Sequence, residues 1–271
     1  MLGFWQENLQ QNYMTKIKRF LVAVPGRLES SRLPNKLLLE IDGISIVTRA
    51  LQNCIKAVGK ERIVFCTDNN ALKSKADELG IEVLMTRKDC DSGSQRICSV
   101  INQMLAFVYK EDKTNKFFNQ EILEKTLIIN VQADQPFLNP NLILKMRDYC
   151  FKKDKIPAIT TPIYKLKAEN IHNPNVVKTL INRRGKAIYF SRSPLPFIRG
   201  LEKKEWGAYS NYYGHVGIYG YRADIIAKWN EFAKSKNYLI IISPNPLTYL
   251  LFPLKEFFNF LYCKVIYKYK S

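Results

Sequence analysis

The chain has 271 residues, a length that suits one large α/β domain or at most two small ones. Its residues are 46% hydrophobic and 12% aromatic, enough to fill a sizeable core, which excludes a disordered, collagen-like or coiled-coil protein. The 42 Lys and Arg residues outnumber the 24 Asp and Glu residues, giving a formal net charge of +18. Such a charge favours an anionic partner: nucleic acid, a membrane surface or a phosphorylated small molecule. Because most lysines are dispersed along the chain, a solvated surface explains the charge somewhat better.

The cysteine pattern indicates a reducing compartment and argues against a zinc site. The 6 cysteines include no CxxC pair, and the two histidines, His172 and His215, lie far from them in the sequence. Cys66 belongs to an apolar run at residues 63–67, where a buried, reduced thiol is expected. Residues 1–18 contain Glu7 and no continuous apolar segment, so they do not resemble a secretory signal. These features predict a cytoplasmic protein.

Strand-like and helix-like segments alternate through the first half of the chain. The predicted strands cover residues 20–24, 62–67, 82–86 and 126–131, and the predicted helices cover residues 46–58, 70–79 and 95–109. A polar stretch at 110–120 is interpreted as a surface insertion. The less regular second half predicts strands at 158–162, 176–181 and 216–221. This order predicts an α/β fold with a mostly parallel mixed sheet and helices on both faces, in which ligands bind beyond the carboxyl ends of the strands.

The loop after the first predicted strand carries closely spaced cations. Its sequence, P-G-R-L-E-S-S-R-L-P-N-K at residues 25–36, places Arg27, Arg32 and Lys36 beside small and hydroxyl residues. Charge-assisted contacts and exposed backbone N–H groups suit a polyphosphate. The loop matches neither GxxxxGK[ST] nor GxGxxG. A solvated basic loop is the alternative, but the position at the ligand-binding edge of the sheet favours phosphate binding.

An acidic residue follows the fourth predicted strand. The sequence V-Q-A-D-Q-P at residues 131–136 puts Asp134 at the same edge of the sheet as the basic loop. Mg²⁺ usually takes one or two carboxylates together with phosphate oxygens, so Asp134 is the candidate metal ligand. Taken alone, an aspartate there would more often cap a turn or a helix. The neighbouring basic loop makes metal binding the better interpretation.

Several motifs resemble the family of 3-deoxy-D-manno-octulosonate (KDO) cytidylyltransferases, the CMP-KDO synthetases. They are P-G-R-x-x-S-x-R-L-P-x-K (25–36), C-T-D (66–68), T-R-x-x-x-x-S-G-S-x-R (86–96), N-V-Q-A-D-Q-P (130–136), N-P-N-x-V-K (173–178), Y-F-S-R-S-x-x-P (189–196) and H-V-G-I-Y-G-Y-R (215–222). The resemblance runs in order from Lys18 to Trp229. The first motif is shared with other nucleotidyltransferases, whereas the last two are characteristic of this family.

The resemblance implies a Rossmann-like nucleotide-diphospho-sugar transferase fold and a reaction in which CTP and KDO give CMP-KDO and pyrophosphate, for lipopolysaccharide biosynthesis. It also implies Mg²⁺ as cofactor and a homodimer, with no nucleic-acid partner; the interrupted apolar stretches predict no membrane span. The family positions for the nucleotide correspond to Arg27, Arg32, Lys36, Ser92, Gly93 and Gln132, and the metal position corresponds to Asp134. Of these, Arg27, Lys36 and Asp134 are the candidate catalytic residues.

Arg192 and His215 correspond to family positions on the sugar-acid side, where a cation would pair with the KDO carboxylate. Each has a simpler alternative. His215 could be a hydrogen-bonded core histidine, and Arg192 could pair with an acidic neighbour. Tyr219 and Tyr221 alternate in a predicted strand and are expected to pack rather than to contact substrate.

The sequence departs from the family pattern at several positions. Ala133 and Gln135 replace the glycine and the acid of V-Q-G-D-E-P. A methyl group at residue 133 would obstruct the nucleotide if the backbone there approached the ligand or took a positive φ. Gln95 replaces the glutamate of S-G-T-E-R, and Asn35 and Leu37 replace a glycine and a proline in the basic loop.

The largest departure is at the carboxyl end. The resemblance predicts late E-Q-L-R and G-V-D-T-P-E-D segments, the second carrying another metal carboxylate, but no Asp follows Asp224 in this sequence. We therefore divide the chain into an extension (1–17), a cytidylyltransferase domain (18–236) and an atypical apolar tail (237–271), and we expect impaired activity. A frameshift, a truncation or an unusual gene end explains this tail better than a divergent folded terminus.

Two other functions are alternatives. A cytidylyltransferase for a related sugar acid, of the 8-amino-KDO or sialate type, would share the nucleotide motifs, but Y-F-S-R and H-V-G-I-Y-G-Y-R favour the KDO type. A basic nucleic-acid-binding protein would need a clustered Lys/Arg face with interleaved aromatic residues. The sequence contains no helix-turn-helix, RNP or zinc motif, so this alternative ranks last.

Overall fold

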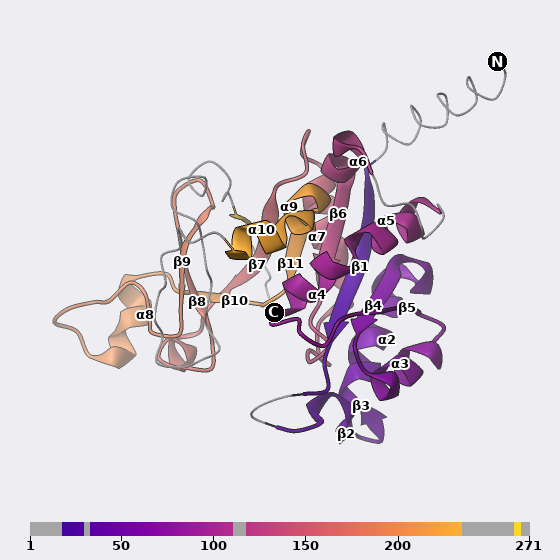
Figure 1. The fold of residues 1–271 in the computed structure, drawn as a ribbon. Helices are drawn as coiled ribbons and strands as arrows, with labels where there is room; N and C mark the ends of the chain where they lie inside the picture. Colours follow the sequence, from indigo (N-terminus) through magenta and orange to yellow (C-terminus); the bar gives the residue numbers. More distant parts are fainter. Residues whose placement is uncertain (1–17, 30–32, 111–117, 235–262, 267–271) are drawn as a thin grey trace, which may run out of the picture.

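The computed structural model describes residues 18–29, 33–110, 118–234 and 263–266 (Figure 1). The proposed extension at 1–17 and most of the proposed tail at 237–271 lie outside the described residues. Within the tail, residues 263–266 form a strand that joins the central sheet.

A mixed β-sheet runs through the middle of the structure. Its strands are β1 (Arg19–Gly26), β4 (Ile63–Thr67), β5 (Glu82–Met85), β6 (Thr126–Asn130), β7 (Ile159–Lys165), β8 (Lys178–Ile181), β9 (Ala187–Ser191), β10 (Tyr213–His215), β11 (Tyr219–Arg222) and β12 (Cys263–Ile266). Their order is β5-β4-β1-β6-β11-β7-β10-β8-β9, and β12 also pairs with β7. The pairs among β5, β4, β1 and β6 are parallel, whereas β11, β10 and β9 run antiparallel to their neighbours. A separate short hairpin joins β2 (Glu40–Ile41) to β3 (Ile44–Ser45).

Helices cover both faces of this sheet. They are α2 (Ile46–Val58), α3 (Asn70–Asp77) and α7 (Pro140–Phe151) on one face, and α4 (Gly93–Ser99), α5 (Ile101–Tyr109), α6 (Gln120–Lys125) and α9 (Ala223–Ala227) on the other, with α10 (Trp229–Lys234) beside α9. Alternate residues of β1 enter the two cores, with Val22 and Val24 on the first face and Leu21 and Ala23 on the second. The predicted α/β fold is therefore confirmed. No helix within the described residues is long and apolar enough to cross a membrane.

Two predicted elements are interrupted. The helix predicted at 95–109 is split into α4 and α5, because Val100 has a non-helical conformation (φ −123°, ψ 18°). The Ser99 hydroxyl donates a 2.7 Å hydrogen bond to the Arg96 carbonyl, which competes with helical hydrogen bonding at this point. The strand predicted at 216–221 starts later, as β11, because Gly217 takes a positive φ of 83° after β10. Helix α7 and strand β9 lie in segments for which the sequence predicted no element.

Strands β8, β9 and β10 carry a small lobe that lies on the left in Figure 1, away from α2 and α3. Its own core contains Leu166, Ile171, Trp206 and Tyr212. The Tyr212 hydroxyl donates a 2.6 Å hydrogen bond to the Pro196 carbonyl, which holds the irregular proline loop against this core. The lobe also contains α8 (Trp206–Tyr209) and the 3-10 turns η3 (Ala168–Asn170) and η4 (Lys203–Glu205); the turns η1 (Lys36–Leu38) and η2 (Lys60–Arg62) belong to the larger part.

The thiols at positions 54, 66, 90, 98 and 150 are free and buried. Burial raises the pKa of the Cys66 thiol, so that this group stays protonated at neutral pH. The predicted buried, reduced thiol at Cys66 is confirmed.

A buried ion pair fixes the end of β11 to α9. Arg222 and Asp224 are 9% and 5% exposed, and their side chains form two hydrogen bonds, Nε to Oδ1 at 2.5 Å and Nη2 to Oδ2 at 2.8 Å. Arg222 Nη1 also donates to the Ile156 carbonyl at 3.2 Å. Asp224 is thus committed to this pair.

We predict that Asp224→Asn lowers the free energy of unfolding by about 3–5 kcal/mol, because the substitution leaves the Arg222 charge buried without a counter-ion. Denaturant unfolding measures the loss. Asp77→Asn is the matched control, since the Lys73–Asp77 pair is largely exposed and should be worth less than about 1 kcal/mol. Equal losses in the two variants would contradict the assignment.

Candidate functional site

A cavity of about 460 Å³ lies at the carboxyl ends of β1 and β6. This is the edge of the sheet where the sequence predicts ligand binding. The loop after β1, the segment after β6 and the start of α4 form its walls, and we call it the edge cavity. It is lined by Arg27, Lys36, Ser92, Gly93, Gln132 and Asp134, the predicted nucleotide and metal residues within the described ranges. Arg32, also predicted, lies outside the described residues.

Lys36 and Asp134 form an ion pair in the edge cavity. Lys36 Nζ lies 2.8 Å from Asp134 Oδ2 although the residues are 98 positions apart in the chain. The side chains are 38% and 47% exposed, so the pair adds at most about 1 kcal/mol to stability. Its importance is chemical, because it places a cation and a carboxylate together at the ligand-binding edge of the sheet.

The backbone before Lys36 explains one departure from the family pattern. Asn35 has φ 55° and ψ 23°, in the left-handed region where glycine is most at ease and asparagine is the best-tolerated alternative. The short turn η1 then starts at Lys36, and Leu37 is buried beneath it. Asn35 therefore keeps the loop geometry that aims Lys36 at the cavity.

The start of α4 is held close to β1 by a glycine. A Cβ atom on Gly93 would lie 2.9 Å from Pro25 Cγ, which is closer than carbon atoms approach, so only glycine fits here. Ser92 caps the helix by accepting a 3.1 Å hydrogen bond from the Gln95 N–H. Gln95 Oε1 in turn accepts a 2.6 Å hydrogen bond from the Asp91 N–H. The neutral amide of Gln95 thus accepts the hydrogen bond from the Asp91 N–H at a position where the family has a glutamate.

The segment after β6 tolerates its alanine. Ala133 is buried, and it is not among the non-glycine residues with positive φ, which within the described ranges are Asn35, Asp42 and Lys110. The strain that a positive φ would impose at Ala133 is therefore not found. Gln132 is oriented by a 2.9 Å hydrogen bond from its Nε2 to Asn130 Oδ1.

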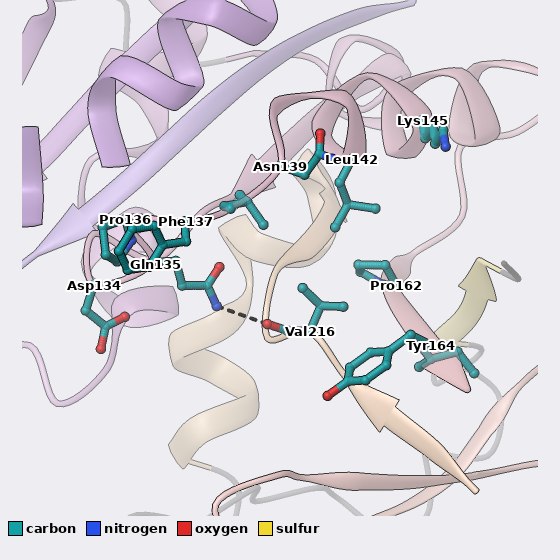
Figure 2. A pocket seen from close by; sticks show the side chains of 12 residues that line it. Asp134, Gln135, Pro136, Phe137, Asn139, Leu142, Lys145, Pro162, Tyr164 and Val216 are labelled. Atoms are coloured by element: carbon teal, nitrogen blue, oxygen red, sulfur yellow. Dashed lines mark hydrogen bonds between the residues drawn. The ribbon is translucent and has the colours of Figure 1, made fainter. Parts of the chain in front are cut away.

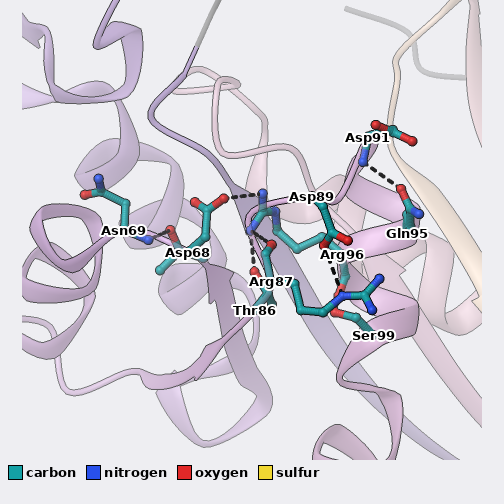
Figure 3. A network of polar contacts seen from close by, with 10 residues as sticks. Asp68, Asn69, Thr86, Arg87, Asp89, Asp91, Gln95, Arg96 and Ser99 are labelled. Carbon is teal, nitrogen blue, oxygen red and sulfur yellow. Dashed lines mark hydrogen bonds and ion pairs between the residues drawn. The ribbon is translucent and has the colours of Figure 1, made fainter.

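Arg96 and Asp68 form a buried network beneath the edge cavity that the sequence analysis did not identify as functional (Figure 3). Arg96 is 2% exposed, and its Nη2 lies 2.8 Å from Asp68 Oδ2. Its Nη1 donates to Thr86 Oγ1, and Asp68 and Thr86 follow β4 and β5 respectively. One guanidinium therefore ties two strand-end loops to α4. Asp68 and Arg96 belong to the sequence motifs at 66–68 and 86–96, but only the folded structure shows that their side chains pair.

A second cavity of about 460 Å³ shares Asp134 with the edge cavity (Figure 2). It is lined mainly by apolar groups of the 135–142 segment and of β7. Gln135 reaches across it to donate a 3.0 Å hydrogen bond from Nε2 to the Val216 carbonyl. Gln135 thus connects the segment after β6 to the chain that follows β10.

Of the two predicted sugar-acid residues, His215 ends β10 in the antiparallel part of the sheet and Arg192 directly follows β9; neither lines these two cavities. His215 Nε2 lies 2.8 Å from Thr161 Oγ1, and burial lowers the pKa of the imidazole to about 4. Arg192 Nη1 donates to the Pro174 carbonyl at 2.9 Å and to the Asn175 carbonyl at 3.5 Å, rather than to an acidic neighbour. The strand register brings the two residues near each other, because β8 pairs with both β9 and β10 through Lys178.

The carboxylates of the edge cavity could bind a metal ion only together with oxygens from a bound phosphate. Within the described residues, no group of three or more His, Cys, Asp and Glu side chains is arranged to hold a metal ion. Asp134 provides one carboxylate, and Glu29 and Asp91 line the same cavity. This donor set suits Mg²⁺, which commonly combines one or two carboxylates with phosphate oxygens and water.

The site and the sheet together define a nucleotide-binding α/β protein, with a basic loop and a carboxylate meeting at the carboxyl ends of its strands. Residues 21–242 match the family model for cytidylyltransferases. The chain belongs to the cytidylyltransferase family, and it is a nucleotidyltransferase by that membership.

Relatives and a solved structure agree with this family. The chain is 31% identical to the 3-deoxy-manno-octulosonate cytidylyltransferase of Idiomarina loihiensis, over 80% of each chain. It is 35% identical to the Legionella pneumophila protein of the same name, over 78% of this chain and 75% of the relative. Its fold resembles CMP:2-keto-3-deoxy-manno-octonic acid synthetase complexed with CTP, with a TM-score of 0.64 and 26% identity over 80% of each chain.

We predict that His215 makes stability fall at acidic pH. The pKa of its imidazole is lowered from 6.5 to about 4, so between these values the unfolded chain binds a proton that the folded chain does not. The free energy of unfolding should therefore decrease as the pH falls below 6.5, by at most about 1.4 kcal/mol per unit from this group.

Denaturant unfolding at pH 7 and pH 5, for wild type and His215→Gln, isolates this contribution from that of the carboxylates. Wild type should lose roughly 1–2 kcal/mol more than the variant between the two pH values. The same loss in both proteins would show that His215 titrates normally in the folded state.

Proposed function

We propose that this chain transfers the cytidylyl group of CTP to KDO, forming CMP-KDO and releasing pyrophosphate. The observation that carries the proposal is the edge cavity, in which Lys36 and Asp134 meet at the carboxyl ends of the strands. Relatives named for this reaction, matched over about four-fifths of the chain, support the choice of substrates.

The nucleotide would lie along the edge cavity. Ser92 and Gly93 border the part nearest α4, where the base and ribose would lie, and Arg27 and Lys36 line the part where the triphosphate would lie. The negative triphosphate would draw Lys36 away from Asp134, because charge-assisted contacts to phosphate oxygens are at least as strong as the half-exposed ion pair. A bound nucleotide would therefore replace Asp134 as the anionic partner of Lys36.

In the reaction, the anomeric hydroxyl oxygen of the sugar acid attacks the α-phosphorus in line. The new O–P bond forms as the bond to the β-phosphate oxygen breaks, the hydroxyl proton is released, and pyrophosphate leaves. The protein supplies position and charge rather than covalent chemistry. Arg27 and Lys36 offset the charge that develops on the leaving pyrophosphate.

Asp134 would hold Mg²⁺ together with phosphate oxygens, and the ion, when bound, would neutralise charge on the reacting phosphates. Asp134 is accessible for this role, since its carboxylate is 47% exposed and, within the part of the chain that the structure describes, its ion pair is with Lys36. Asp224 is unavailable, because it is buried against Arg222.

Arg192 and His215 would meet the sugar acid in different ways. His215 is neutral at pH 7, because burial keeps its pKa near 4, so it can act through hydrogen bonds but not through charge. Arg192 therefore supplies the positive charge for the KDO carboxylate. This division of roles gives one ionic and one neutral contact on the acceptor side.

We also propose that the enzyme acts in the cytoplasm, as a homodimer that provides CMP-KDO for lipopolysaccharide biosynthesis. Exposed apolar side chains of the small lobe support self-association, since Ile188, Phe197 and Tyr209 are 60%, 73% and 68% exposed.

Pyrophosphate release tests the function directly. We predict release with CTP, Mg²⁺ and KDO together and none with CTP and Mg²⁺ alone.

The variant Asp134→Asn should abolish this release while the circular dichroism spectrum stays unchanged. Asp89→Asn is its control, because Asp89 is an exposed aspartate of the same region whose ion pair, among the described residues, is with Arg87. Near-normal release from Asp134→Asn would remove Asp134 from the metal site. Release that does not depend on KDO would overturn the proposed function itself.

A further inference from the structure

The turn at residues 173–176 directs four successive carbonyl oxygens at two cations. Lys178 Nζ donates to the carbonyls of Asn173 and Val176, the latter at 3.0 Å. Arg192 Nη1 donates to the intervening carbonyls of Pro174 and Asn175, at 2.9 and 3.5 Å. The turn is therefore a cradle of neutral oxygens shared by an ammonium and a guanidinium.

Lys178 also binds the main chain of Arg192 itself. Its third hydrogen bond goes from Nζ to the Arg192 carbonyl, at 2.8 Å. An ammonium has three donors, and all three are satisfied by main-chain oxygens. One side chain thus fixes both the backbone from which Arg192 projects and the turn on which its guanidinium rests.

The ammonium is fully buried, which is unusual for a lysine. A buried charge is costly unless it is fully hydrogen-bonded, and here the partners are neutral carbonyls rather than a carboxylate. Burial and the neighbouring Arg192 both lower the pKa of Lys178. A hydrocarbon side chain would fill this position of β8 more cheaply, so packing alone does not account for the lysine.

The strand register also places Lys178 beside the strand that carries His215, the other residue proposed to meet the sugar acid. Lys178 of β8 pairs with Ser191 of β9 on one side and with Gly214 of β10 on the other. His215 is the next residue of β10, and Arg192 directly follows Ser191, the last residue of β9. Lys178 therefore lies at the centre of a three-strand row, and both residues directly follow members of that row.

We infer that Lys178 is a positioning residue for the sugar acid, acting by fixing the main chain and guanidinium of Arg192 so that its charge meets the carboxylate. This inference rests on the proposed function for the identity of the acid. Without the ammonium, the Val176 and Arg192 carbonyls lose this donor, the Asn173 carbonyl keeps only the Val176 N–H at 3.2 Å, and Arg192 is free to leave the turn.

The test compares Lys178→Met with Thr179→Val in the full chain. Thr179 is the matched control, because it is the next residue of β8, is buried and has a side-chain oxygen that makes no hydrogen bond to the described part of the chain. Lys178→Met should raise the KM for KDO by about tenfold or more and leave the KM for CTP within about twofold. Thr179→Val should change neither constant.

A second readout does not depend on turnover. Phenylglyoxal modifies exposed guanidinium groups, and peptide mass spectrometry gives the rate at Arg192. The rate should rise several-fold in Lys178→Met and match wild type in Thr179→Val. If Lys178→Met does not fold, as judged by circular dichroism, Lys178→Gln keeps two neutral N–H donors in place of three charged ones and should give a smaller increase.

An unchanged Arg192 modification rate, or equal increases in the KM for KDO and for CTP, would overturn the positioning role. A wild-type protein that releases no pyrophosphate from CTP and KDO would instead overturn the proposed function, and the modification rate at Arg192 would still decide the role of Lys178.

Discussion

The ion pair between Lys36 and Asp134 is the interaction on which the site depends. It joins the loop after β1 to the segment after β6, two neighbouring strands whose carboxyl ends reach the same edge. The pair itself is weak because it is half exposed, so neighbouring structure must hold its partners in place. Asn35 sets the backbone before Lys36, and the contact of Gly93 with Pro25 brings the start of α4 to the same edge. Because the ion pair is weak while the backbone around it is held in place, Lys36 can leave Asp134 for the phosphates of a charged ligand.

The distribution of charge explains how one protein could accept two anionic substrates. Arg96 is neutralised by Asp68 and serves as internal support, whereas Arg192 and Lys178 are bonded to neutral carbonyls and keep their charge. His215 adds no charge at neutral pH. In the proposed function, the positive charge on the acceptor side would lie where the carboxylate binds, and Lys36 would provide charge separately for the triphosphate. Only a few of the cations behind the net charge of +18 would then have a role in binding.

The sequence predicts the parallel half of the fold well because its signals are local. Helix α2 has the predicted bounds, since its apolar spacing and the Ser45 cap both lie within one segment. The basic loop and Asp134 were found because they directly follow buried strands, and the structure brings them into contact. Long-range pairings carry no such signal. The Arg96–Asp68 link, the antiparallel pairing of β8 with β9 and β10, and the carbonyls that hold Arg192 join segments whose contacts depend on the folded chain.

The most direct test of this account is CTP affinity, measured by calorimetry in metal-free buffer for wild type, Lys36→Ala and Asp134→Asn. Lys36→Ala should weaken binding by about 1.5–3 kcal/mol, because one charged contact to the triphosphate is lost. Asp134→Asn should tighten binding, because Lys36 no longer has a competing partner and the triphosphate no longer faces a carboxylate. Adding Mg²⁺ should reverse the order of wild type and Asp134→Asn. If Asp134→Asn weakens metal-free binding as much as Lys36→Ala does, the ion pair is a structural contact and not the exchange point for the nucleotide.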